Sequence, residues 1–149
     1  MKKYNNILIG IDGSDEARVA FEQAVKIAKD ENATLHIAHV IDAHSLTTID
    51  QYVPYNVSIA DATKYGETLL DEYVEKAKEA GLENVKKVLE TGSPKRDIAG
   101  KIAEENNIDL IVAGATGLNA IERLLIGSVS ENIVRRATCD VLIVRNTQN

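Results

Sequence analysis

Five short apolar runs, most of them rich in β-branched residues, alternate along the chain with longer stretches that repeat apolar residues at helical spacing. These runs are residues 7–11, 34–41, 85–90, 109–113 and 141–144. Strands separated by helices pair in parallel, through right-handed crossovers that pack the helices against the sheet. The alternation therefore predicts an α/β fold, a single open five-stranded parallel sheet flanked by helices on both faces, in one domain spanning residues 1–149.

The helical stretches begin and end at residues with matching local preferences. Ser14 is placed to cap the first helix, and Ser93 followed by Pro94 is a strong start for the third. Gly81 is placed to end the second helix, which the apolar repeat predicts over residues 60–80. The apolar residues that mark these helices are Ala17, Ala20, Phe21, Ala24, Ile27, Ala28, Tyr65, Leu69, Tyr73, Ala77, Ile98, Ile102, Val129, Ile133 and Val134.

The position of a ligand site follows from the order of the strands. In an open parallel sheet, ligands bind beyond the carboxyl ends of the strands, where the strand order reverses. If the order is 3-2-1-4-5, the reversal lies between the first and fourth strands. Asp12 follows the first strand and Gly114 follows the fourth, so we expect them to face each other across one crevice.

Three glycines follow the fourth strand at fixed spacing. Two residues separate Gly114 from Gly117, and nine separate Gly117 from Gly127. Glycine lets a ligand approach where a Cβ would collide, and the free N–H groups at a helix N-terminus favour phosphate. Ser128 begins the last helix, and its hydroxyl and that of Ser130 add donors. The segment predicts a phosphate site made by two separated turns.

Each of these features also has a simpler interpretation. Glycine turns and serine caps are common, so either one alone indicates only a turn or a cap. Their combination after a parallel strand favours a nucleotide site. Arg123, within the same segment, is placed either to reach a phosphate or to lie on a solvated helical face.

The spacing of these glycines and the hydroxyl that follows resembles the pattern of ATP-binding members of the universal stress protein family. Residues 7–14, 92–94 and 141–145 resemble the family's first strand with its Asp-Gly-Ser exit, its third helix start and its last strand. The resemblance implies an adenine nucleotide alpha hydrolase-like fold of order 3-2-1-4-5 with ATP at the reversal point. It also implies a homodimer paired through the strand from Val141 to Val144, and a nucleotide-dependent regulator of the stress response.

Carried over by position, the resemblance assigns residues to the nucleotide. Asp12, next to Ile11, lies near the ribose or phosphates, and the backbone of Val40 and Ile41 meets adenine. The other cofactor-binding residues are Ala113, Gly114, Thr116, Gly117, Arg123, Gly127, Ser128, Val129 and Ser130. Thr116 replaces a basic or larger polar residue of many members, which removes one possible charge toward phosphate.

Asp12 is also the candidate ligand for Mg²⁺ carried by ATP, since one or two carboxylates together with phosphates satisfy that ion. The alternative is a turn residue whose side chain accepts from nearby N–H groups. His36 and His39 lie three apart on a strand and therefore face opposite sides. With His44 they form a possible metal set, but surface or packing roles are favoured.

Charge and cysteine content exclude several classes of function. A formal net charge of −6 disfavours binding to nucleic acid or to an anionic membrane. Cys139 is the one cysteine, so no internal disulfide forms, and we expect a buried, unreactive thiol in a reducing cytoplasm. No apolar run approaches the length needed to span a bilayer.

The sequence contains no P-loop and no dinucleotide fingerprint after the first strand. No residue set indicates nucleophilic or general acid–base catalysis, so we predict no catalytic residues and at most slow ATP hydrolysis. One alternative is a nucleotide-independent dimeric interaction protein of the same fold, using the predicted loop at 42–59 or the fifth strand. A phosphotransfer receiver is a third possibility, which Asp12 and Arg145 serve poorly.

Overall fold

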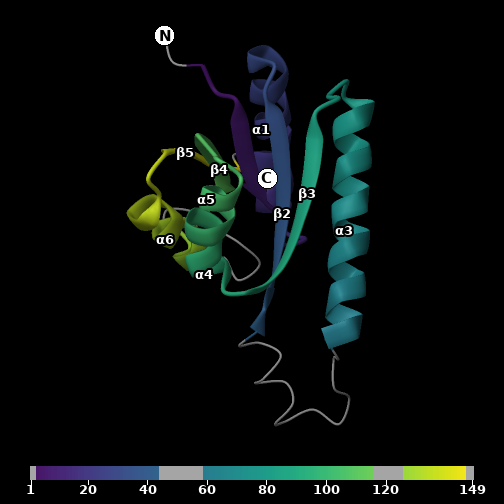
Figure 1. Cartoon of the computed structure of the whole chain (residues 1–149), viewed down its shortest axis with the longest axis vertical. Helices are drawn as coiled ribbons and strands as arrows, with labels where there is room; N and C mark the ends of the chain where they lie inside the picture. Colours follow the sequence, from purple (N-terminus) through teal and green to yellow (C-terminus); the bar gives the residue numbers. More distant parts are fainter. Residues whose placement is uncertain (1–2, 44–58, 116–125, 147–149) are drawn as a thin grey trace.

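The computed structural model describes residues 3–43, 59–115 and 126–146. Within these ranges lies a sheet whose neighbouring strands all pair in parallel, in the order β3-β2-β1-β4-β5 (Figure 1). Its strands are β1 (Asn6–Gly10), β2 (Thr34–Asp42), β3 (Val85–Gly92), β4 (Leu110–Gly114) and β5 (Asp140–Val144). This confirms the predicted α/β fold, including the order 3-2-1-4-5.

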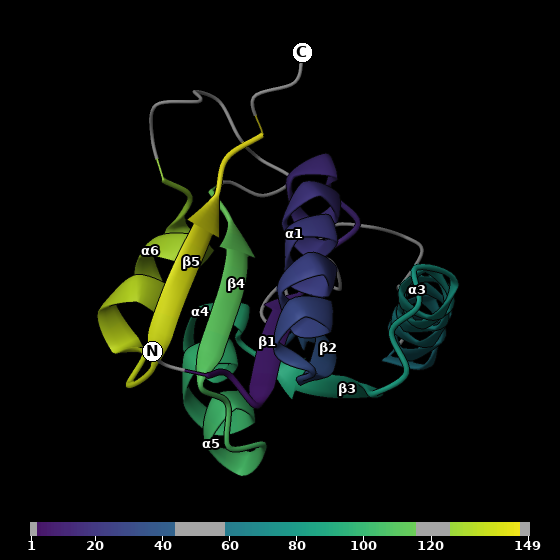
Figure 2. The same cartoon turned by 90° about the horizontal axis from the view of Figure 1, so that it is seen from above.

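Helices cover both faces of this sheet, as predicted. Figure 2 shows one layer formed by α1 and α3, and on the other side of the sheet a layer formed by α4, α5 and α6. The bounds are α1 (Asp15–Glu31), α3 (Ile59–Glu79), α4 (Pro94–Asp97), α5 (Ala103–Glu105) and α6 (Ser128–Arg136). One turn of π-helix, η1 (Ile98–Ile102), joins α4 to α5.

The sheet separates two apolar cores. Successive side chains of a strand point to opposite faces, so Ile7 and Ile9 pack with α1 and α3 while Leu8 packs with the other layer. All three are fully buried. The edge strands β3 and β5 are more exposed than β1 and β4.

The predicted caps are found where the local sequence places them, with one difference. The Ser14 hydroxyl oxygen accepts the Ala17 N–H at 3.1 Å and caps α1. Gly81 lies two residues after the end of α3 and has a φ of +97°, a conformation that suits glycine. Ser93 is the N-cap residue of α4, before Pro94, but its side chain makes no capping bond.

Two residues of the predicted apolar stripes are exposed, and Cys139 is only half-buried. Tyr65 is 55% exposed because the buried stripe of α3 runs beside it, through Gly66 and Leu69. Val134 is 53% exposed because the short helix α6 buries only Ser130 and Ile133. Cys139 packs against the second core and is half-buried, where a buried thiol was expected.

Candidate functional site

The candidate site lies at the carboxyl ends of the central strands β1 and β4. From β1 the chain enters α1 on one face of the sheet, whereas α6, which precedes β5, lies on the other face (Figure 2). The strand order therefore reverses between β1 and β4. Both strand ends and the N-terminus of α1 meet here, which is the position that open parallel sheets use for ligands.

The first turn of the site connects β1 to α1. The Ile11 N–H donates to the Ala38 carbonyl oxygen at 2.8 Å, which extends the pairing with β2 by one residue. An Asp12 carboxylate oxygen accepts the Ser14 N–H at 2.9 Å. Asp12 thus performs the local turn role weighed as the alternative, and its half-buried side chain lies at the reversal point.

The second turn brings the end of β4 against the start of α6. The Gly127 N–H donates to the Ala115 carbonyl oxygen at 2.7 Å, and the Ser130 hydroxyl donates to the Gly114 carbonyl oxygen. The Ala115 N–H donates to the Val144 carbonyl oxygen at 2.9 Å. The predicted proximity of the segments after residues 113 and 126 is therefore found. Three predicted site residues lie outside the described residues: Thr116, Gly117 and Arg123.

The N-terminus of α6 has no side-chain cap from its N-cap residue. That residue is Gly127, in extended backbone with φ −65° and ψ 160°. The first intrahelical bond runs from the Glu131 N–H to the Gly127 carbonyl oxygen at 2.9 Å. The N–H groups of Ser128, Val129 and Ser130 precede it, and helix geometry gives them no intrahelical acceptor. Such N–H groups suit an anion.

Gly114 also brings the site into contact with α1. A Cβ built on Gly114 would lie 2.9 Å from the Glu16 carbonyl oxygen and 3.1 Å from its carbonyl carbon. Both are backbone atoms, which cannot turn aside as a long side chain can. The glycine therefore permits close packing of β4 against the first turn of α1, in addition to any approach by a ligand.

The end of β2 forms a third side of the site. The register pairs Gly10 with Ala38, so Val40 lies beyond the end of β1. Backbone N–H and C=O groups alternate in direction along a strand, so those of Val40 point to the same side as those of Ala38. The groups of Ile41 point instead toward β3. Of the two predicted adenine contacts, only Val40 has backbone groups that point to the side of β1.

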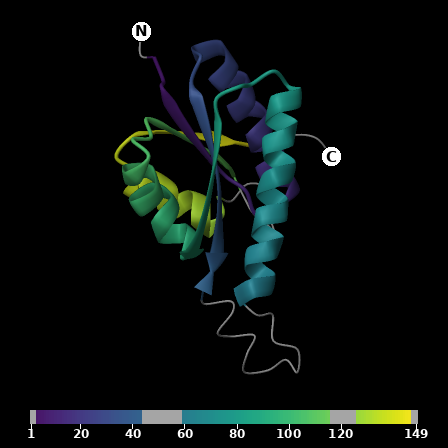
Figure 3. The ribbon, with the colours of Figure 1, turned by 45° about the vertical axis from the view of Figure 1, so that its right-hand side comes forward.

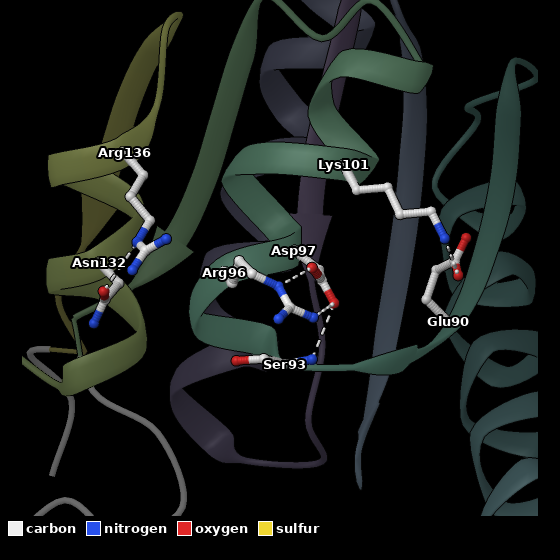
Figure 4. A network of polar contacts seen from close by, with 7 residues as sticks. All are labelled: Glu90, Ser93, Arg96, Asp97, Lys101, Asn132 and Arg136. Carbon is white, nitrogen blue, oxygen red and sulfur yellow. Dashed lines mark hydrogen bonds and ion pairs between the residues drawn. The ribbon is translucent and has the colours of Figure 1, made fainter. Parts of the chain in front are cut away.

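A second polar cluster lies at the start of α4, beyond the end of β3 (Figure 4). The buried Asp97 carboxylate accepts the Ser93 N–H at 3.0 Å and the Arg96 Nε–H at 2.8 Å. The hydrogen bond from Arg96 lowers the pKa of Asp97, against the opposing effect of burial. Arg96 is largely exposed, and its guanidinium holds this carboxylate. The cluster takes the place of a serine cap.

The histidines occupy opposite faces, as predicted. His36 is buried, with Nε2 3.1 Å from the Asn6 side-chain oxygen, and Nδ1 has no hydrogen-bond partner among the described residues. Burial, with the charge of Lys86, lowers the pKa of His36. His39 lies on the other face, and its Nδ1–H donates to the Ile11 carbonyl oxygen at 2.8 Å. No group of three or more His, Cys, Asp or Glu within the described ranges is arranged to hold a metal; His44 lies outside them.

The model of the universal stress protein family matches residues 3–145. This chain belongs to the universal stress protein family. A protein of Staphylococcus aureus strain USA300 that bears the family's name is 48% identical over 149 residues, which are 99% of this chain and 88% of that protein.

Solved structures share the fold. The hypothetical protein MJ0577 matches with a TM-score of 0.84 at 24% identity, over 99% of this chain and 100% of that one. A universal stress protein in complex with cAMP matches with a TM-score of 0.74 at 32% identity, over 99% and 100% of the two chains. UspA from Lactobacillus plantarum matches with a TM-score of 0.68 at 32% identity, over 97% and 100%.

Sequence reasoning missed two residues that shape this edge of the sheet. Asp97 was not singled out, because it lies four residues after the N-cap Ser93, one position beyond the acid of a capping box. Tyr65 was assigned to the core, and no local signal distinguishes it from the buried stripe.

No described helix is long and apolar enough to cross a lipid bilayer.

Proposed function

We propose that this family member binds ATP at the ends of β1 and β4 and acts as a nucleotide-dependent regulator of the stress response. One observation carries the proposal: the bonds from Gly127 to Ala115 and from Ser130 to Gly114 hold the N-terminus of α6 beside the reversal point of the sheet. The free N–H groups and the positive end of the helix dipole there suit the phosphates.

The rest of the nucleotide fits the neighbouring residues. The outward-facing backbone groups of Val40 suit the donor and acceptor edge of adenine. Asp12 lies between the two ends of such a ligand, beside Ile11, and has a second carboxylate oxygen for the ribose or for Mg²⁺ on the phosphates. Ala113, Gly114 and, by the resemblance, Thr116, Gly117 and Arg123 complete the set.

The ligand class has independent support. A relative 32% identical to this chain was solved in complex with cAMP, which contains adenine, ribose and phosphate. We propose ATP because the two turns supply N–H groups from separate segments, enough to follow a phosphate chain. No catalytic residues are proposed, and hydrolysis is slow at most.

We also propose a homodimer paired through β5. This strand pairs with β4 on one side, and Val141, Leu142, Ile143 and Val144 are half-exposed in the single chain. Exposed strand edges pair readily with another strand. The same exposed edge is the observation that favours the alternative, a nucleotide-independent dimeric interaction protein of the same fold. We further propose that residues 1–149 form a single domain and that the protein acts in the cytoplasm. We propose no nucleic acid or membrane partner.

The test is calorimetric titration of the purified protein with ATP, ADP, AMP and cAMP, preceded by mass spectrometry for co-purified nucleotide. Gly127→Val is expected to weaken ATP binding at least about tenfold, because a branched side chain at the N-cap obstructs the phosphate. The fold should survive, since valine adopts the extended backbone of Gly127.

Gly100→Val is the matched control, because a Cβ at Gly100 meets nothing within 4 Å. It should bind ATP as the unmodified protein does. Undiminished affinity in Gly127→Val contradicts the proposed site. A protein that binds none of the four nucleotides supports the nucleotide-independent alternative.

A further inference from the structure

Tyr65 of α3 lies against the turn that follows β1, although its sequence position suggests a core residue. Its side chain is 55% exposed. Gly13, next to Asp12, has a φ of +83°, and a Cβ built there would lie 2.7 Å from the Tyr65 hydroxyl oxygen. The phenol therefore occupies the space directly over the turn that carries Asp12.

Gly66 explains how α3 comes close enough. A glycine inside a helix costs about 1 kcal/mol relative to alanine, so a packing reason is expected. A Cβ built on Gly66 would lie 2.9 Å from Cδ2 of His39 and 2.8 Å from Cδ1 of Leu89. The absence of this carbon lets α3 approach β2 and β3, along which it runs in Figure 3.

His39 fixes the direction of the Tyr65 ring. The two rings meet edge to face, with centroids 6.0 Å apart and an angle of 69° between their planes. His39 is itself held by its 2.8 Å bond to the Ile11 carbonyl oxygen. A chain of contacts thus runs from α3 through β2 to the end of β1, and it ends beside Asp12.

We propose that Tyr65 contacts the bound nucleotide, its hydroxyl donating a hydrogen bond to a ribose or phosphate oxygen held at the turn of Asp12 and Gly13. This inference rests on the proposed nucleotide function. The hydroxyl makes no hydrogen bond to any described residue, so the donor is available. The ring is already oriented by His39, so little conformational freedom is lost when the ligand binds.

The competing explanation is structural: the ring covers Gly13 and supports the turn. That role depends on the ring and not on the hydroxyl, so Tyr65→Phe separates the two. Calorimetric titration with ATP should show about fivefold weaker binding for Tyr65→Phe, the effect of one lost hydrogen bond, with an unchanged unfolding temperature. Tyr65→Leu should bind more weakly still.

Ile59→Ala is the matched control, since Ile59 is on the same helix and 64% exposed. It should bind ATP as the unmodified protein does. Tyr65→Phe and Tyr65→Leu variants that bind ATP with undiminished affinity would overturn the role of Tyr65 and leave the proposed function intact. An unmodified protein that binds no adenine nucleotide overturns both.

A second readout measures ATP binding on the unmodified protein and uses Tyr65→Phe only to assign one signal. With ring-labelled tyrosine, the chain gives signals from five tyrosines, and Tyr65→Phe identifies the one from Tyr65. Addition of ATP to the unmodified protein should shift that signal. Adding adenosine and then ATP distinguishes a ribose contact from a phosphate contact. A Tyr65 signal that stays in place while calorimetry shows bound ATP overturns the inference.

Discussion

The helices α1 and α6 both begin at the carboxyl edge of the sheet, but their N-termini are built differently. At α1 the Ser14 side chain caps the helix, Asp12 accepts the Ser14 N–H, and Asp15 and Glu16 occupy the first turn. Local acceptors and negative charge already satisfy this end of the helix dipole. At α6 the N-cap is a glycine, so this end depends on water or a ligand.

The two helix N-termini occupy equivalent positions at the sheet edge, but this difference gives them distinct roles. The first turn of α1 carries two acids, Asp15 and Glu16, whereas the first turn of α6 carries one, Glu131, which pairs with Arg135 at 2.5 Å. Phosphate is therefore favoured at the start of α6 over the start of α1. Ser130 illustrates the contrast, because its hydroxyl donates across to Gly114 on β4 and does not cap its own helix. A serine near a helix start is thus a local cap in α1 and a tertiary contact in α6.

The largest expected change in stability comes from Gly114, which contacts the first turns of both α1 and α6. Gly114→Ala places a Cβ 2.9 Å from the Glu16 carbonyl oxygen, and the backbone of α1 must shift to relieve it. We expect a loss of about 2 kcal/mol in the free energy of unfolding, measured by urea denaturation. A variant as stable as the unmodified protein would show that α1 and β4 are not tightly packed there.

Adding a negative charge to the start of α6 tests its role directly. Ser128→Asp should stabilise the helix by about 0.5 kcal/mol through the dipole, yet weaken ATP binding about tenfold by repelling the phosphates. Val134→Asp puts the same charge on the exposed side of α6, away from its start, and should leave the affinity unchanged. Calorimetry measures the affinity of both variants for ATP. Equal affinities would contradict phosphate binding at the start of α6.

Removing the hydroxyl of Ser14 or of Ser128 tests how far each helix start depends on a serine side chain. Ser14→Ala should lower the free energy of unfolding by about 1 kcal/mol, because the Ala17 N–H loses its acceptor. Ser128 is exposed and lies after the N-cap, so Ser128→Ala should change stability by only about 0.2 kcal/mol. Thermal unfolding measures both. Similar losses in the two variants would mean that both helix starts depend on side-chain caps.

The smallest expected effect is a pH dependence of the unfolding free energy. It comes from His36, which lies on β2 and not at either helix start. Burial lowers the pKa of His36 from its ordinary value of 6.5, so the unfolded chain binds the proton more readily. Stability from this group is present above that value and is lost as the pH falls through it. Between pH 7.5 and 5.5, the unfolding free energy should fall less steeply in His36→Gln than in the unmodified protein. Equal slopes of unfolding free energy against pH would show that His36 does not cause this pH dependence.

Much of the fold follows from features that neighbouring residues determine on their own. The alternation of apolar runs and helical repeats indicates the α/β class, because side-chain periodicity reflects only local backbone geometry. Ser14 and Gly81 act as predicted for the same reason, since a cap bonds to residues within one turn. The strand order came from the family resemblance, and the sheet confirms it.

Tertiary structure alone decided how the edge of the sheet is built. The local sequence does not reveal that Gly114 packs on Glu16, or that the backbone of Val40, and not that of Ile41, points to the side of β1. Nor does it reveal that Tyr65 lies outside the buried stripe of α3, toward Gly13. These contacts join segments far apart in the chain. They depend on how helices and strands pack together, whereas periodicity and capping depend on the few residues of a single turn.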